Sequence, residues 1–154
     1  MNVNQMGNYF DDFVVGETVR HPLSKTIFES DNNFFSLLTM NNHPVHTNLD
    51  YASRNQHEKI LVVGTLVFSL SVGLTVGEIS GQAIANLDYE QVKHLAPVFI
   101  GDTIYAETTV LDKRESKSKS DRGIVYVETV AYNQNKTPVL SFRRHVLVKK
   151  APVK

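Results

Sequence analysis

An uncharged segment in the middle of the chain constrains the fold more than any other feature. It runs from Ile60 to Gly77 and reads ILVVGTLVFSLSVGLTVG. As a helix it is barely long enough to cross a bilayer, and glycine, serine and threonine dilute its apolar side chains. Strand-like segments typical of a water-soluble domain follow it. We therefore interpret it as a helix buried in a protein core and expect no membrane association.

The same segment also has the alternation of a strand. Between positions 66 and 76, large apolar residues alternate with mostly small ones. Two observations nevertheless favour a helix. The run is long for a strand, and the glycines at its two ends, Gly64 followed by Thr65 and later Gly81, are residues that begin and end helices well.

Shorter elements precede this helix. Residues 17–29 hold two short strand-like pieces, which Pro22 separates. Residues 30–40 favour a helix with Ser30 or Asp31 as its cap, and residues 48–56 favour a second short helix. The apolar face of the first helix would consist of Phe34, Leu37 and Leu38.

The second half of the chain has the alternation of β-strands. Strands are expected over residues 82–95, 103–111, 123–132 and 138–150, with a charged hairpin loop between the second and the third. In the second strand, one face would hold Ile104, Ala106, Thr108 and Val110. A curved antiparallel sheet wrapped around one long central helix is the hot-dog architecture, of class α+β. We expect a single such domain over residues 1–154.

The amino-acid composition excludes several classes of function. The charges balance at 16 basic and 16 acidic residues, which gives no electrostatic footprint for nucleic acid. Cysteine is absent, so disulfide, thiolate and zinc-thiolate chemistry are excluded. The first residues, MNVNQMGNYFDDF, lack the basic and apolar regions of a signal peptide. Together these features predict a cytoplasmic protein.

Four segments, in this order, resemble a known family. They read YFDDFVVGETVRH, NNHPVHTNLDYA, VVGTLVFSLSVG and APVFIGDTIYAE. The chain resembles the MaoC-like dehydratases, the (R)-specific enoyl-CoA hydratase group, over nearly its whole length. It looks closest to the single-domain branch that includes mesaconyl-CoA hydratases and β-methylmalyl-CoA dehydratases. The most specific match is the turn from His43 to His46.

The resemblance implies a reaction and a set of residues. Water would add reversibly across the double bond of a 2-enoyl-CoA thioester, or a 3-hydroxyacyl-CoA would be dehydrated. His46 matches the family histidine that transfers the proton, and Gly64 matches the backbone N–H that polarises the thioester carbonyl. His43, Val63 and Thr65 would complete the substrate-binding residues. Coenzyme A is part of the substrate, so no cofactor or metal is expected, and the family forms homodimers.

The chain departs from the family motif at three positions. Asn41 stands where the family has an aspartate, His43 replaces an asparagine, and Val63 stands where the hydratases often have histidine or asparagine. An amide can orient a water molecule, but it cannot act as a base. We predict that Asn41 faces the reacting water beside His46. The competing interpretation is that Asn41 only caps the turn.

Two other functions stay open at the level of sequence. One is a hot-dog thioesterase that uses a water held by Asn41, and the other is an acyl-CoA-binding protein without catalysis. The remaining histidines are scattered and no two of them have metal-ligand spacing. The charged hairpin either contacts the phosphates of coenzyme A or is simply solvated; its candidates are Lys117, Lys119 and Arg122.

Overall fold

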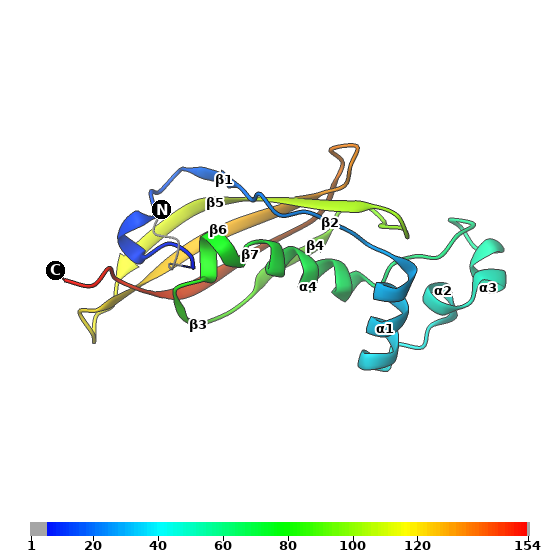
Figure 1. Ribbon diagram of the computed structural model, residues 1–154, viewed down its shortest axis with the longest axis horizontal. Coiled ribbons are helices and arrows are strands. Elements are labelled where there is room, and N and C mark those ends of the chain that lie inside the picture. The colour runs from blue at the N-terminus through cyan, green and yellow to red at the C-terminus, as the bar shows by residue number, and fades with distance from the viewer. Residues whose placement is uncertain (1–5, 154) are drawn as a thin grey trace.

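A long helix lies against one face of a curved sheet in the computed structural model, which describes residues 6–153 (Figure 1). The helix, α4, spans Gly64–Leu74, and the sheet within the described part of the chain is antiparallel and has seven strands. The predicted α+β arrangement of a curved antiparallel sheet with one central helix is therefore confirmed.

Three long strands form the middle of the sheet. They are β5 (Thr103–Glu115), β6 (Arg122–Tyr132) and β7 (Pro138–Lys149). On one side of them, β5 pairs with β1 (Thr18–Arg20) and β2 (Lys25–Thr26). On the other side, β7 pairs with β3 (Ala83–Asn86) and β4 (Glu90–His94). The strand expected over residues 82–95 is thus two short strands, and these form one edge of the sheet.

The core lies between α4 and the sheet because the strands alternate as the sequence predicts. Ile104, Ala106, Thr108 and Val110 of β5 are all buried on the inner face. Apolar side chains of β6 and β7 continue this face, and α4 packs its own buried residues against it. Those buried residues of α4 are Leu66, Val67, Ser71 and Leu74.

Helix α4 ends earlier than the glycine signal predicts. It stops at Leu74, and a π-helical turn, η2 (Val76–Ser80), follows before Gly81. The Thr75 hydroxyl donates to the carbonyl oxygen of Val72 at 2.7 Å. Such a local side-chain bond competes with the helical ladder, so the regular helix ends there.

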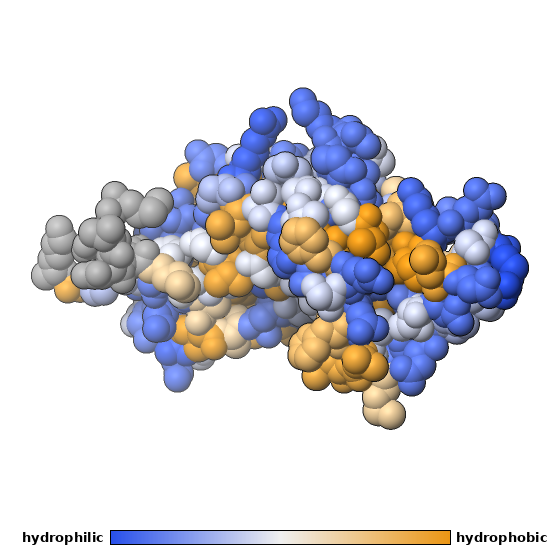
Figure 2. Space-filling model, turned by 45° about the vertical axis from the view of Figure 1, so that its right-hand side comes forward, coloured by the Kyte–Doolittle hydropathy of each residue, from blue (hydrophilic) through white to orange (hydrophobic). Residues whose placement is uncertain are grey.

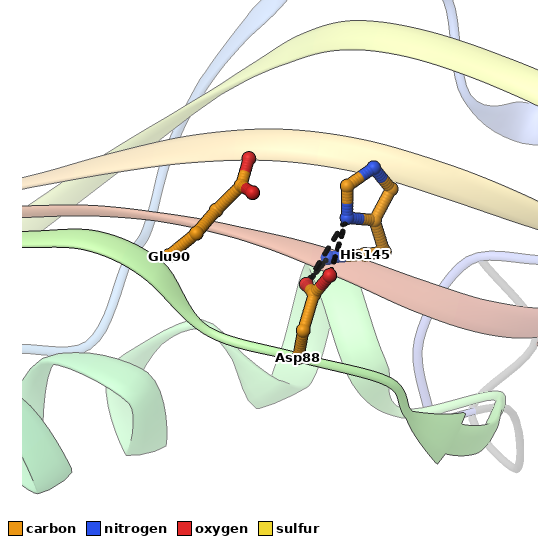
Figure 3. A group of neighbouring side chains, drawn as sticks. All are labelled: Asp88, Glu90 and His145. Carbon is orange, nitrogen blue, oxygen red and sulfur yellow. Dashed lines mark hydrogen bonds and ion pairs between the residues drawn. The ribbon is translucent and has the colours of Figure 1, made fainter.

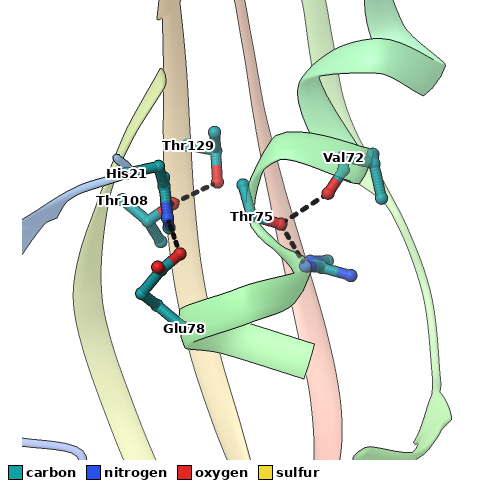
Figure 4. Close-up of polar contacts among 7 residues, drawn as sticks. His21, Val72, Thr75, Glu78, Thr108 and Thr129 are labelled. Atoms are coloured by element: carbon teal, nitrogen blue, oxygen red, sulfur yellow. Dashed lines mark hydrogen bonds and ion pairs between the residues drawn. The ribbon is translucent and has the colours of Figure 1, made fainter. Parts of the chain in front are cut away.

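A polar cluster fills the inner face of the sheet near this end of α4 (Figure 4). The Nδ1 of His21 lies 2.6 Å from a carboxylate oxygen of Glu78, and its Nε2 lies 2.7 Å from the hydroxyl of Thr108. Thr108 in turn lies 2.8 Å from the hydroxyl of Thr129. Each ring nitrogen of the buried His21 therefore has a partner, so this histidine ties η2 to the sheet.

Arg144 is buried on the same inner face. Its guanidinium donates to the hydroxyl of Thr75 at 2.8 Å and to the side-chain oxygen of Asn86 at 3.2 Å. Burial lowers the pKa of Arg144 because it penalises the charged form. The C-terminal end of α4 provides a favourable place for this cation, since the helix dipole is negative there.

The first helix differs from the sequence prediction in its cap and in its buried face. α1 spans Glu29–Thr39, and Phe28 rather than Ser30 or Asp31 is the N-cap residue. Asp31 contributes from the third position of the helix, where its carboxylate accepts the N–H of Phe28 at 2.9 Å. The expected apolar face is exposed, whereas the buried residues are Asn32 and Ser36. The exposed side chains are Phe34, Leu37 and Leu38.

Apolar surface is consequently present near α1. Figure 2 shows one face of the molecule, on which apolar residues gather in patches. One of these patches projects at the lower edge of the view, on the side where α1 lies. Asn32 points inward instead because its amide makes two hydrogen bonds with buried backbone. These two hydrogen bonds of the Asn32 side chain orient the helix, although its hydrophobic periodicity predicts that the opposite residues are buried.

The expected histidine turn is a short helix, α2 (Pro44–Thr47), followed by α3 (Leu49–Ser53). Figure 1 places α1, α2 and α3 together at one end of the molecule, beyond the N-terminus of α4. The short helix η1 (Phe10–Asp12) lies at the opposite end. Among the described residues, no helix combines the length and apolar character needed to span a membrane.

Candidate active site

His46 is held in one orientation by the backbone. It lies in α2, where Pro44 opens the helix and the ring of His43 caps it by accepting the N–H of Val45 at 3.2 Å. The Nδ1 of His46 lies 2.6 Å from the carbonyl oxygen of Leu61. A carbonyl can only accept a hydrogen bond, so Nδ1 carries the hydrogen. In the neutral ring, Nε2 is therefore left with a lone pair that can accept a proton.

Asn32 connects His46 to the start of α4. Its amide nitrogen donates to the carbonyl oxygen of His46 at 3.1 Å, and its amide oxygen accepts the N–H of Val63 at 2.9 Å. The residue is only 1% exposed, so water does not compete for these bonds. Sequence reasoning missed Asn32 because its only signal was a polar residue inside an apolar helical segment.

The N-terminus of α4 presents free hydrogen-bond donors. Val63 is the N-cap residue, but its side chain cannot accept a hydrogen bond. Within residues 6–153, the N–H groups of Gly64 and Thr65 have no acceptor. Unpaired N–H groups and the positive end of the helix dipole favour an oxygen that carries negative charge. No side chain at Gly64 blocks access to its N–H.

A cavity of about 350 Å³ brings His46 and Gly64 together. The rest of its wall is mainly apolar, including Leu61, Val67 and Val98. The structure thus joins an imidazole with a defined tautomer and an unpaired helix N-terminus around one largely apolar space. The imidazole can transfer a proton, and the N–H groups at the helix N-terminus can stabilise negative charge that develops on a nearby carbonyl oxygen.

The other residues proposed from the sequence lie outside this wall. The side-chain oxygen of Asn41 accepts the N–H of His43 at 3.4 Å, a contact within the turn. The His43 ring is exposed, with its centroid 6.1 Å from that of His46. Val63 is buried in the core, and the Thr65 side chain is exposed. Only His46 and Gly64 of the predicted set line the cavity.

Two further histidines line the same cavity, and no motif or spacing in the sequence indicated either of them. His94 comes from the last position of β4, and a Cβ atom built on Gly64 would lie 2.9 Å from its Cε1 and 3.2 Å from its Nε2. His57 packs edge-on against Phe99, with ring centroids 5.3 Å apart. The fold brings the His94 ring to the start of α4, because strand β4 ends beside it.

Comparison with known protein families assigns the chain to one of them. A family model described as MaoC like domain matches residues 12–133. The chain belongs to the MaoC-like domain family. It is 35% identical over 94% of its length to the mesaconyl-CoA hydratase of Cereibacter sphaeroides and to the β-methylmalyl-CoA dehydratase of Chloroflexus aurantiacus. A solved MaoC domain protein of Chloroflexus aurantiacus superposes on the whole chain with a TM-score of 0.91 and 33% identity.

This MaoC-like chain is shorter than those relatives. It spans 42% and 41% of the lengths of the two enzymes and 45% of the solved chain. The branch that it resembles was expected to have a single domain. Its members instead carry additional chain outside the region matched here.

The charged hairpin of the MaoC-like chain lies away from the cavity. Figure 1 places the turn between β5 and β6 at the end opposite α1, α2 and α3. Lys117 and Lys119 are exposed there, and Arg122 pairs with Asp121 at 2.8 Å. That ion pair lowers the pKa of Asp121 and raises the pKa of Arg122. The placement favours a solvated loop over a phosphate-binding one within this chain.

One group of side chains has the composition of a metal site (Figure 3). The ligand atoms of Asp88, Glu90 and His145 lie within 4.8 Å of one another. Their contacts, however, are made among neighbours: His145 pairs with Asp88 at 2.8 Å, and Glu90 accepts the hydroxyl of Tyr126. This hydrogen bond raises the pKa of Tyr126, whose ring stacks on His145. The cluster is thus held by one ion pair, which joins the β3–β4 connection to β7, and by one hydrogen bond, which joins β6 to β4.

Proposed function

We propose that the chain catalyses the reversible addition of water to a 2-enoyl-CoA thioester, and thus also the dehydration of a 3-hydroxyacyl-CoA. The observation that carries the proposal is the shared cavity of His46 and Gly64. The bond to Leu61 fixes the His46 tautomer, and the helix start offers unpaired N–H groups. The names of the hydratase and dehydratase relatives support the same reaction class.

In the hydration direction, the Nε2 atom of His46 takes a proton from a water molecule as the water oxygen forms a bond to C3. The electrons of the C2–C3 double bond shift toward the thioester carbonyl, and negative charge develops on its oxygen. The N–H of Gly64 donates to this oxygen, aided by the helix dipole. The His46 imidazolium then returns its proton to C2. Histidine suits both steps because its pKa lies close to neutral pH.

The cavity also fits the substrate class. Its largely apolar wall can hold an acyl chain, while the polar groups concentrate where the thioester would react. The proposed steps use only side-chain and backbone groups of the chain, so no cofactor or metal is assigned a role. Coenzyme A enters as part of the substrate.

We further propose that the active form is a homodimer joined at the edge of the sheet formed by β3 and β4. An unpaired edge offers backbone groups to another strand, and large apolar side chains are exposed along it. They are Ile84, Leu87, Tyr89, Val92 and Leu95. A cytoplasmic location also belongs to the proposal, because a chain without cysteine suits a reducing compartment.

The proposal is tested with crotonyl-CoA and mesaconyl-CoA. A hydratase lowers the absorbance of the conjugated enoyl thioester and reaches the same equilibrium from the hydroxyacyl side. Release of free thiol would identify a thioesterase instead. A rise in melting temperature with CoA esters but without turnover would identify a binding protein. Gly64→Pro should abolish hydration, because it removes the proposed N–H donor.

A further inference from the structure

We propose that His94 is a catalytic residue, the second hydrogen-bond donor to the thioester carbonyl oxygen, acting beside the N–H of Gly64. This inference rests on the hydration reaction proposed above. It assigns a role to an imidazole from the other side of the cavity, on a strand that is remote in sequence from the histidine turn.

The position of the ring carries the inference. Apart from Gly64, its two chain neighbours and the adjoining helix backbone, the three heavy atoms nearest to a Cβ built on Gly64 all belong to His94. They are Cε1 at 2.9 Å, Nε2 at 3.2 Å and Nδ1 at 3.5 Å. The edge of the ring that holds Cε1 and Nε2 therefore faces the first residue of α4. An oxygen that accepts the N–H of Gly64 would lie next to this edge, within reach of a hydrogen on Nε2.

The ring is also available to a ligand. Within residues 6–153, the His94 imidazole makes no hydrogen bond or ion pair, unlike His21, His46 and His145. A histidine that only stabilised the fold would be expected to have partners, as His21 has. Here the imidazole is exposed, lines the cavity and has its donor capacity unused.

A second donor has a clear chemical purpose. The enolate-like oxygen can accept more than one hydrogen bond, and oxyanion sites commonly combine a backbone N–H with a side-chain donor. Removing one such donor typically costs about 10²-fold to 10³-fold in kcat.

The contact also gives a reason for glycine at position 64. A side chain there would meet the His94 ring at less than the normal contact distance. Gly64→Ala keeps the backbone N–H, so its effect should arise largely from displacing the ring. In a His94→Ala background the added methyl group would meet no ring. The two substitutions should therefore be strongly non-additive in kcat.

The test compares wild type with His94→Ala, His94→Gln and the control Arg114→Ala. We expect His94→Ala to lower kcat on crotonyl-CoA about 10²-fold with a small change in KM, and His94→Gln to restore part of the loss through its amide N–H. Arg114→Ala should match wild type, because Arg114 is exposed on β5 and lies outside both the cavity wall and the β3–β4 edge. Butyryl-CoA labelled with carbon-13 at the carbonyl supplies a second readout, since it cannot be hydrated.

The infrared carbonyl frequency of bound butyryl-CoA should be lower in wild type and His94→Gln than in His94→Ala, because a lost donor leaves the carbonyl less polarised. An unchanged kcat, or a lower kcat with an unchanged carbonyl frequency, would overturn the role of His94 while leaving the hydratase proposal intact. If wild type hydrates no enoyl-CoA, the proposed function fails and the inference fails with it. Should His94→Ala not fold, the kcat and the carbonyl frequency of His94→Gln and of Gly64→Ala decide, because the methyl group added at Gly64 displaces the His94 ring.

Discussion

The Nδ1 atom of His46 lies 2.6 Å from the carbonyl oxygen of Leu61. This contact joins α2 to the segment that leads into α4, and the N–H of Leu61 also donates to the carbonyl oxygen of Val45 at 3.2 Å. The imidazole is therefore oriented by backbone that continues directly into α4. A backbone carbonyl here orients the ring in the way that a carboxylate orients the imidazole of many catalytic pairs.

His46→Ala should lower hydratase kcat by about 10²-fold to 10⁴-fold, because it removes the only proposed proton-transfer group. Its effect on stability should be about 1 kcal/mol, the contribution of the lost hydrogen bond. His21→Ala is the matched control: it should destabilise the protein by about 1–3 kcal/mol, since Glu78 and Thr108 lose a buried partner, yet retain kcat. Urea unfolding and initial rates on crotonyl-CoA measure the two quantities. Wild-type turnover by His46→Ala would exclude the mechanism.

Asn32→Ala should impair both folding and catalysis. The substitution leaves the N–H of Val63 and the carbonyl oxygen of His46 without their buried partner, which costs about 1–3 kcal/mol of unfolding free energy. It also loosens the spacing between His46 and Gly64, so kcat should fall. Asn33→Ala, at the neighbouring exposed position of α1, should change neither quantity. Equal unfolding midpoints for wild type and Asn32→Ala would contradict this account.

Asn41→Asp tests the missing carboxylate. The contact between Asn41 and the N–H of His43 favours a capping role, and aspartate caps equally well. We therefore expect the curves of kcat/KM against pH to overlap for the two proteins. Higher turnover with the acidic limb moved to higher pH would instead show a carboxylate beside His46, because it would stabilise the imidazolium and leave His46 neutral only at higher pH.

Val92→Glu tests assembly at the β4 edge. Wild type should be a dimer in light scattering at micromolar concentration, and the variant should be a monomer because a charge on the edge opposes strand pairing. Val15→Glu replaces another exposed valine, which lies outside the β3–β4 edge, and should remain dimeric. A monomeric wild type, or a dimeric Val92→Glu, would rule out this edge as the interface.

Asp31→Ala should lower stability by about 1 kcal/mol at neutral pH through the loss of a helix cap. The hydrogen bond from Lys25 holds the pKa of Asp31 below its ordinary value of 3.8. The pKa of Asp31 is lower in the folded than in the unfolded state. The stabilisation is therefore complete above the unfolded-state pKa and is lost as the pH falls through the lowered folded-state pKa. The stability gap between the proteins should therefore close below about pH 3.8. Glu29→Ala, in the same helical turn but without such a bond, should show no gap of this kind.

The sequence by itself determined the sheet and the central helix. Alternating side chains from Ile104 to Val110 indicate which face of β5 is buried, and that face is buried in the structure. The long apolar segment after Gly64 indicates the helix against it. These predictions succeed because burial of apolar surface is the largest local signal that a sequence carries. The family resemblance then indicated His46 and Gly64 as partners.

The tertiary structure alone decided which polar groups meet. Hydrophobic periodicity predicts that α1 buries Phe34 and Leu37, yet the helix buries Asn32, because its amide completes hydrogen bonds to His46 and Val63. His94 reaches Gly64 only because β4 pairs with β7 and returns past the start of α4. Such contacts join residues far apart in the chain, and a hydrogen bond depends on distances of a few ångströms that no local pattern encodes.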